Sequence, residues 1–192
     1  YSAVDGVLFN KIMDTLIYFP DRKTNDSKSY EIPATVRKVE ERAFSGYLLT
    51  ETITFEAGTD ISVIGTYMFY RVSNVKKITI PRSVTLIDSY AFYNSKIGTF
   101  AFEAGSCLKA INDYAFNCTS LNKIDFSEGL KTIGEGSFDG SSLPYIILPD
   151  SLEVIGKGAF RYSDITMIDI PPNVTIIDDE AFIDSYSAIS KN

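Results

Sequence analysis

A phenylalanine recurs along most of the chain at a nearly constant spacing, and this repeat limits the folds that the chain can adopt. The successive gaps are 25, 23, 24, 22, 22 and 22 residues. The seven copies are Phe44, Phe69, Phe92, Phe116, Phe138, Phe160 and Phe182. A fixed period of this length is typical of solenoids, in which each unit buries its apolar side only by stacking on its neighbours. We therefore expect an elongated stack of coils rather than one compact core.

The apolar residues between the phenylalanines repeat as well. The unit from Ile165 to Phe182 has apolar residues at six positions, and three earlier units have apolar residues at the matching six. Two units are longer because they carry the corners FEAGTD (55–60) and FEAGSC (102–107), each of which adds two residues. Stacked coils tolerate insertions at corners when the apolar pattern is kept, so these insertions agree with a solenoid.

Each unit contains one clear strand signal. Apolar and polar residues alternate in Ile78-Thr79-Ile80 and Ile168-Asp169-Ile170, which indicates strands with one buried face. A second short extended segment follows, and the Ala-Phe segment is short enough to be a 3₁₀-like turn. We predict a mostly β solenoid with two narrow parallel sheets and little regular helix. Four glycines recur at the repeat period and are expected to have positive φ at turns, namely Gly134, Gly136, Gly156 and Gly158.

Composition excludes several classes of function. The chain has no histidine, which removes Ser-His-Asp and Cys-His catalysis, and no nucleophile has a base at a recognisable spacing. With 18 basic and 25 acidic residues the net charge is −7, which disfavours nucleic acids and anionic membrane surfaces as partners. No apolar run reaches the ~18 to 20 residues that span a bilayer, so we expect no direct membrane insertion in this segment. We predict no enzyme activity, no catalytic residue and no cofactor.

The densest acidic run is the one candidate for a metal site. Asp178, Asp179 and Glu180 are followed by Asp184, and Ca²⁺ binds several oxygen ligands. The run lacks the spacing of a calcium loop and lies on a turn before a repeat phenylalanine. We therefore predict solvated turn charges and no metal.

The repeated pattern resembles a known family. The phrase IPxxVxxIxxxAF followed by LxxIxIP is similar to the BspA-like (Treponema pallidum-type) leucine-rich repeat family. The opening segment VDGVLFNKIMDTLIYFP resembles the degenerate first unit of such proteins. The resemblance implies a right-handed leucine-rich repeat superhelix with an N-terminal cap at 1–29, seven repeats of 22–25 residues at 30–185, and a C-terminal tail at 186–192.

The resemblance also implies a function. Members are bacterial surface or secreted proteins associated with adhesion to host matrix proteins, and the family has no active site to carry over. Cys118 falls where the family favours Cys or Asn, which implies a buried, reduced thiol. A disulfide between Cys107 and Cys118 stays open as the alternative.

The residues that alternate with the buried strand residues form the concave wall of such a solenoid. On two late coils the wall carries Tyr145, Ile147 and Met167, and an exposed apolar cluster with an aromatic member can anchor a protein partner. The candidate partner-binding residues are Tyr145, Ile147, Met167, Asp169, Lys123 and Asp125. The alternative is that neighbouring residues cover these side chains, or that they are isolated surface residues.

Two other functions and one structural question stay open. The repeats could be a structural spacer without a ligand, or part of a glycan-binding surface protein. The residues after Ser185 contain neither a proline stop nor a strongly polar cap, so if the chain ended with them, the last coil would expose Ile168, Ile170 and Phe182 laterally. We therefore expect either further repeats in a longer protein or end-to-end self-association.

Overall fold

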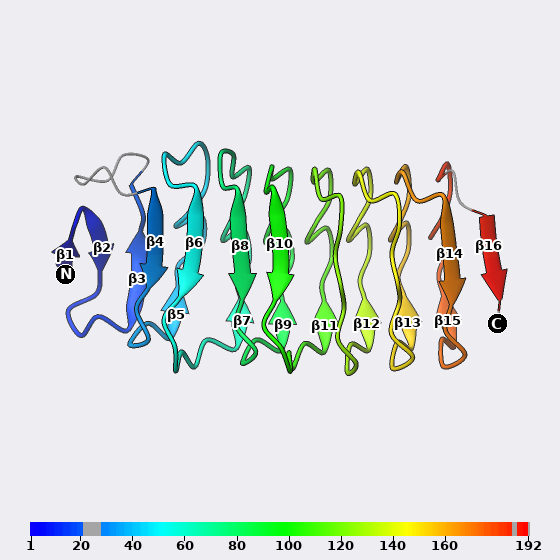
Figure 1. Ribbon diagram of the computed structural model, residues 1–192, viewed down its shortest axis with the longest axis horizontal. Helices are drawn as coiled ribbons and strands as arrows, with labels where there is room; N and C mark the ends of the chain where they lie inside the picture. The colour runs from blue at the N-terminus through cyan, green and yellow to red at the C-terminus, as the bar shows by residue number, and fades with distance from the viewer. Residues whose placement is uncertain (21–27, 186–187, 192) are drawn as a thin grey trace.

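The computed structural model describes residues 1–20, 28–185 and 188–191. These residues form a solenoid of short strands and turns, and none of them is helical. The coils follow one another along the long axis, so that the two chain ends lie at opposite ends of the molecule (Figure 1). The predicted β solenoid is therefore confirmed.

Two rows of parallel strands run along the solenoid. The first row contains β4 (Ser29–Ile32), β6 (Thr52–Phe55), β8 (Lys77–Ile80), β10 (Thr99–Phe102), β14 (Met167–Ile170) and β16 (Ala188–Lys191). The second row contains β5 (Lys38–Val39), β7 (Val63–Ile64), β9 (Leu86–Ile87), β11 (Ala110–Ile111), β12 (Thr132–Ile133), β13 (Val154–Ile155) and β15 (Ile176–Ile177). Equivalent core residues pair in register, for example Ile53 with Ile78. Each strand therefore places its repeat residues directly over those of the preceding coil.

The N-terminal segment joins the stack by antiparallel pairing. It contains β1 (Ser2–Val4), β2 (Val7–Phe9) and β3 (Thr15–Tyr18). These three strands pair antiparallel, and β3 then pairs parallel with β5. The segment thus continues into the second row of strands and covers its first coil.

The repeat phenylalanines form a single stacked column in the core. From Phe69 to Phe182 neighbouring rings are 5.0–5.5 Å apart and nearly parallel, with interplanar angles of 4–7°. The column continues through Phe44 to Phe19, whose ring lies 4.9 Å from that of Phe44. Offset aromatic stacks add to the burial of apolar surface, so the column stabilises every junction between coils.

The first row is interrupted where the prediction placed regular strands. Between β10 and β14 the structure has isolated bridges that join Asp125 to Ile147 and Tyr145 to Met167. Pro144 begins one of these segments and has no N–H group to donate to the preceding coil. The first sheet is therefore continuous from β4 to β10 but not through residues 123–148.

Only two of the four repeat glycines have the predicted backbone. Gly136 and Gly158 have positive φ, at 55° and 57°. The prediction was wrong for Gly134 and Gly156, which are needed because coils approach closely. A Cβ added to Gly134 would lie 2.9 Å from the carbonyl carbon of Asn112 on the preceding coil. A Cβ added to Gly156 would lie 2.7 Å from the carbonyl carbon of Gly134.

The prediction of a buried thiol at Cys118 is also wrong. Cys107 and Cys118 are both exposed and unpaired. Cys118 has a left-handed backbone, with φ of 53°, and the preceding residue Asn117 is the buried one. The positive φ two residues after the repeat phenylalanine recurs at Asn94 and Asp184, so this position belongs to the outer turn.

The expected lateral exposure of Ile168 and Ile170 is not found. These side chains are only 1% and 4% exposed, because β16 pairs in parallel with β14 along its whole length. Phe182 is partly buried against the core. Residues 188–191 therefore continue the first row of strands.

Candidate interaction surface

The candidate surface lies on the outer side of the first row of strands, and we call it the first-strand face. It consists of the side chains that alternate with the buried ones on β4, β6, β8, β10 and β14 and on segments 123–126 and 145–148. On the early coils these side chains are mostly polar, for example Thr52, Thr54 and Lys77. The apolar members lie at the other end of the solenoid.

Three apolar side chains on the first-strand face lie close together and are open to solvent. Tyr145 is 52% exposed, Ile147 is 61% exposed and Met167 is 51% exposed. A parallel bridge joins Tyr145 to Met167, which places the two side chains on adjacent coils. The structure thus brings together the three apolar residues that the sequence singled out, and we call them the apolar patch.

The patch is held in place by the buried residues between its members. Ile146 is 2% exposed and Leu148 is 6% exposed, so the segment alternates strictly between core and solvent. A shift of the segment by one residue would bury Tyr145 and expose Ile146 and Leu148 to solvent. The burial of these two residues therefore keeps the patch directed outward. The patch is thus anchored by core residues on either side of Ile147.

A small hollow lies within the patch. It has a volume of about 100 Å³ and is lined by Tyr145, Ile146, Ile147, Leu148, Met167 and Asp169. Asp169, another of the predicted residues, is thus part of its lining. A hollow of this size, with apolar side chains and one carboxylate in its lining, can receive one side chain of a partner.

Charged residues lie on the coil before the patch. The Lys123 ammonium and the Asp125 carboxylate form an ion pair at 2.7 Å, and a bridge joins Asp125 to Ile147. Both side chains are about 70% exposed, at 73% and 69%. Such an exposed pair adds little to stability, so its groups can exchange partners at low cost.

A second surface feature was not anticipated from the sequence. Tyr67, Tyr90 and Tyr114 stack on the outer turns, with ring centroids 4.9 Å and 5.2 Å apart. The Arg42 guanidinium lies 4.9 Å from the Tyr67 ring at one end of this tyrosine column. The sequence did carry a signal for this column, because a tyrosine stands two residues before the repeat phenylalanine in three successive units. Because the rings cover each other's faces, the column chiefly supports the turns.

The tyrosine column ends at a hydrogen bond. The Tyr114 hydroxyl donates to the Glu135 carboxylate at 2.5 Å, and this bond together with partial burial raises the pKa of Tyr114 to about 12. The tyrosine is therefore a neutral donor at physiological pH. It orients Glu135 and offers no reactive group.

The acidic run contains turn residues with local partners. The Asp179 N–H donates to the Asp178 carboxylate at 2.8 Å, and Glu180 lies 3.5 Å from the Arg161 guanidinium. Within the described ranges, no group of three or more potential metal-ligating side chains is found. In the same ranges, no helix has the length and apolar character required to cross a membrane.

Two solved structures share the fold of this chain. The pneumococcal vaccine antigen PcpA aligns with a TM-score of 0.60 and 20% identity, over 92% of this chain and 54% of that one. A leucine-rich repeat protein from Eubacterium ventriosum aligns with a TM-score of 0.60 and 24% identity, over 100% of this chain and 51% of that one. The chain therefore spans about half the length of either structure. A search of curated protein sequences gives no match.

The sequence also matches a repeat family. The BspA type leucine rich repeat region matches in six copies, over residues 22–116 and 96–191. These ranges include all seven repeat phenylalanines and the apolar patch. The chain belongs to the BspA type leucine rich repeat family.

Proposed function

We propose that this chain is a non-enzymatic, bacterial cell-surface or secreted protein that adheres to a host or matrix protein through the first-strand face. Leucine-rich repeat proteins generally serve protein interaction, and solenoids present extended binding surfaces. The observation that carries the proposal is the apolar patch of Tyr145, Ile147 and Met167. A repeat array that acts only as a spacer gains nothing from solvent-exposed apolar side chains.

The patch has the composition of an interface anchor. Tyrosine and methionine are enriched in the cores of protein interfaces, and tyrosine is frequent among the residues that dominate binding energy. Tyr145 and Met167 flank the hollow, so a partner side chain would contact both. Lys123 and Asp125 on the preceding coil, and Asp169 in the lining of the hollow, would supply polar groups at the rim of such an anchor.

Site-specific photo-crosslinking tests the proposal directly. We would place a photoreactive benzoylphenylalanine at Ile147 and expose the protein to purified host extracellular-matrix proteins one at a time. The control carries the same group at Val63, which is 40% exposed but lies in the second row of strands. The proposal predicts a crosslink to at least one matrix protein from position 147 and none from position 63. Equal crosslinking from both positions would contradict the assignment to the first-strand face, and no crosslink from position 147 across the panel would contradict the proposal and favour a spacer.

A further inference from the structure

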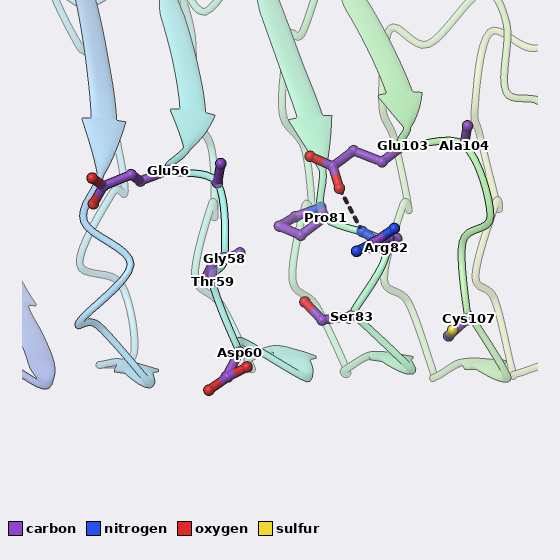
Figure 2. A pocket seen from close by; sticks show the side chains of 11 residues that line it. Glu56, Gly58, Thr59, Asp60, Pro81, Arg82, Ser83, Glu103, Ala104 and Cys107 are labelled. Atoms are coloured by element: carbon purple, nitrogen blue, oxygen red, sulfur yellow. Dashed lines mark hydrogen bonds between the residues drawn. The ribbon is translucent and has the colours of Figure 1, made fainter.

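The two lengthened corners build a groove. Corner 56–60 and corner 103–107 stand on either side of the shorter corner 81–83, and the space between them has a volume of about 540 Å³ (Figure 2). The walls are two coils apart, or about 10 Å at ~4.8 Å per strand. One extended polypeptide segment fits between walls at that separation. The insertions therefore add a site that a regular array lacks.

The carboxylates in the walls of this groove already have partners. Glu56 and Glu103 each accept a backbone N–H group from the preceding corner, and Asp60 forms an ion pair. The bonds are Ala34 N–H to Glu56 at 2.8 Å, Arg82 N–H to Glu103 at 3.0 Å, and Arg37 guanidinium to Asp60 at 2.9 Å. These contacts hold the two walls in place: the Arg37 guanidinium neutralises Asp60, and the neutral N–H groups turn the Glu56 and Glu103 carboxylates toward the preceding corners.

The Arg82 guanidinium on the floor of the groove differs from the other arginines that the structure describes. Arg37, Arg42 and Arg161 form ion pairs, and Arg71 lies 5.5 Å from the Tyr70 ring. Within residues 1–20, 28–185 and 188–191, the Arg82 side chain has no hydrogen bond, ion pair or ring contact. Its five N–H groups are therefore open to a ligand in the groove.

We propose that the groove binds an extended segment of a partner protein and that an Asp or Glu side chain of this segment pairs with Arg82. A guanidinium binds a carboxylate through two parallel hydrogen bonds, which fixes the ligand in orientation as well as position. The other lining residues are small or neutral, among them Pro81, Ala57 and Ala104, and suit small neutral neighbours of the acidic residue. Because the chain has a net charge of −7, a segment with one carboxylate is favoured over a strongly acidic one.

The test is an NMR titration of the whole ¹⁵N-labelled chain with two blocked pentapeptides. One peptide has glutamate at the centre of four alanines, and the other has glutamine there. The Nε–Hε signal of Arg82 and the amide signals of Gly58 and Gly105 report on the floor and the two walls. The glutamate peptide should shift all three saturably. The glutamine peptide should bind about tenfold more weakly, because a charge-assisted hydrogen bond is replaced by a neutral one.

Matched variants assign the effect to one side chain. Arg82→Gln should abolish the difference between the two peptides, whereas Arg71→Gln, which removes another exposed arginine, should retain it. Unchanged signals from the rest of each spectrum show that the variants are folded. Equal binding of both peptides to the unaltered chain, or no saturable shift at Arg82, would overturn the proposal. Tighter binding of a lysine peptide would also overturn it, since the wall carboxylates would then select the ligand.

Discussion

The Tyr114 ring lies directly on Gly136, so closely that a Cβ at position 136 would be 2.5 Å from Tyr114 Cε1. The tyrosine column of one half of the solenoid therefore ends on a glycine of the next coil. Stacking on Tyr90 and the hydrogen bond to Glu135 hold the ring in place, so it cannot move aside freely. Tyr114 and Gly136 each stand two residues before the repeat phenylalanine of their own unit. The contact explains why this position changes from tyrosine in one unit to glycine in the next.

This contact predicts that Gly136→Ala destabilises the protein more than Gly158→Ala. Both glycines are buried and have nearly the same φ, at 55° and 57°, but an added Cβ at Gly158 meets only ordinary contacts at 3.7 Å. Gly158→Ala should lower the free energy of unfolding by ~1–2 kcal/mol because alanine is strained in the left-handed region. Gly136→Ala should cost about 1–3 kcal/mol more because it overpacks the site.

Chemical denaturation of the variants measures both costs. In a Tyr114→Ala background the steric contribution is gone, so the two glycine substitutions should become equally destabilising. Retention of the difference in that background would show that the ring contact is not its cause.

Asp88 links three consecutive coils, which predicts a pH-dependent contribution to stability. Its carboxylate accepts hydrogen bonds from the Thr66 hydroxyl at 2.9 Å and the Asn112 amide at 2.8 Å, and also from the Ser89 N–H. Burial alone would raise the pKa of Asp88, but the hydrogen bonds from Asn112, Ser89 and Thr66 outweigh it and lower this pKa below its usual 3.8. A carboxyl group with a lowered pKa stabilises the fold above its unfolded-state pKa, and this contribution is lost as the pH falls through the folded-state pKa.

We therefore expect Asp88→Asn to lower the free energy of unfolding at pH 7 by about 1 kcal/mol, and the deficit to shrink at pH values below 3.8. Urea denaturation of both proteins across this pH range gives the comparison. Asp164→Asn is the control, because the Asp164 carboxylate is exposed and lacks a hydrogen bond or ion pair with any described residue. A deficit for Asp88→Asn that stays constant with pH would contradict the assigned hydrogen bonds.

The two thiols should be accessible in the folded protein. Both cysteines are exposed, and partial burial together with the Asp139 carboxylate raises the pKa of Cys118. Ellman's reagent should therefore modify two thiols per chain without denaturant. Because the thiolate is the reactive form, Cys118 in a Cys107→Ser variant should react faster when Asp139 is also changed to Asn.

The rate comparison at pH 8 separates charge from access, since Asp139→Asn keeps the shape of the side chain. An unchanged rate after that substitution would remove Asp139 as a cause of the raised pKa. Failure of Cys118 to react in the native state would contradict its exposure.

The sequence was sufficient to predict the solenoid because its signal is periodic and apolar. The phenylalanine spacing and the alternation at Ile78-Thr79-Ile80 predict the stacked core and the strands, and both are found. The apolar patch was predictable for the same reason, since alternation alone decides which side chains point outward. Phe19, 25 residues before Phe44, carried the same signal for the N-terminal coil.

Features that depend on contacts between coils were not predictable in this way. Cys118 was expected inside because its family position suggested a ladder, but the direction of its side chain is set by a left-handed backbone. Gly134 is required by the close approach of another coil, and spacing carries no information about such distances. The groove around Arg82 is formed by two insertions that lie two coils apart. Glu56 and Glu103, which belong to these insertions, are separated by 47 residues in the sequence, so the sequence alone does not show that they line one groove.

Binding of the crosslinked matrix protein to Tyr145→Ala/Met167→Ala tests the central claim most directly. Isothermal titration calorimetry would compare the Kd of this double variant with those of the unaltered chain and of Tyr162→Ala. Tyr162 is 58% exposed but lies on an outer turn, so its loss controls for removal of exposed aromatic surface. We predict at least a ~30-fold weaker Kd for the double variant, as for anchors worth about 2 kcal/mol, with unchanged thermal stability and no effect of Tyr162→Ala. An unchanged Kd for a folded double variant would contradict the assignment of the apolar patch as the partner-binding site.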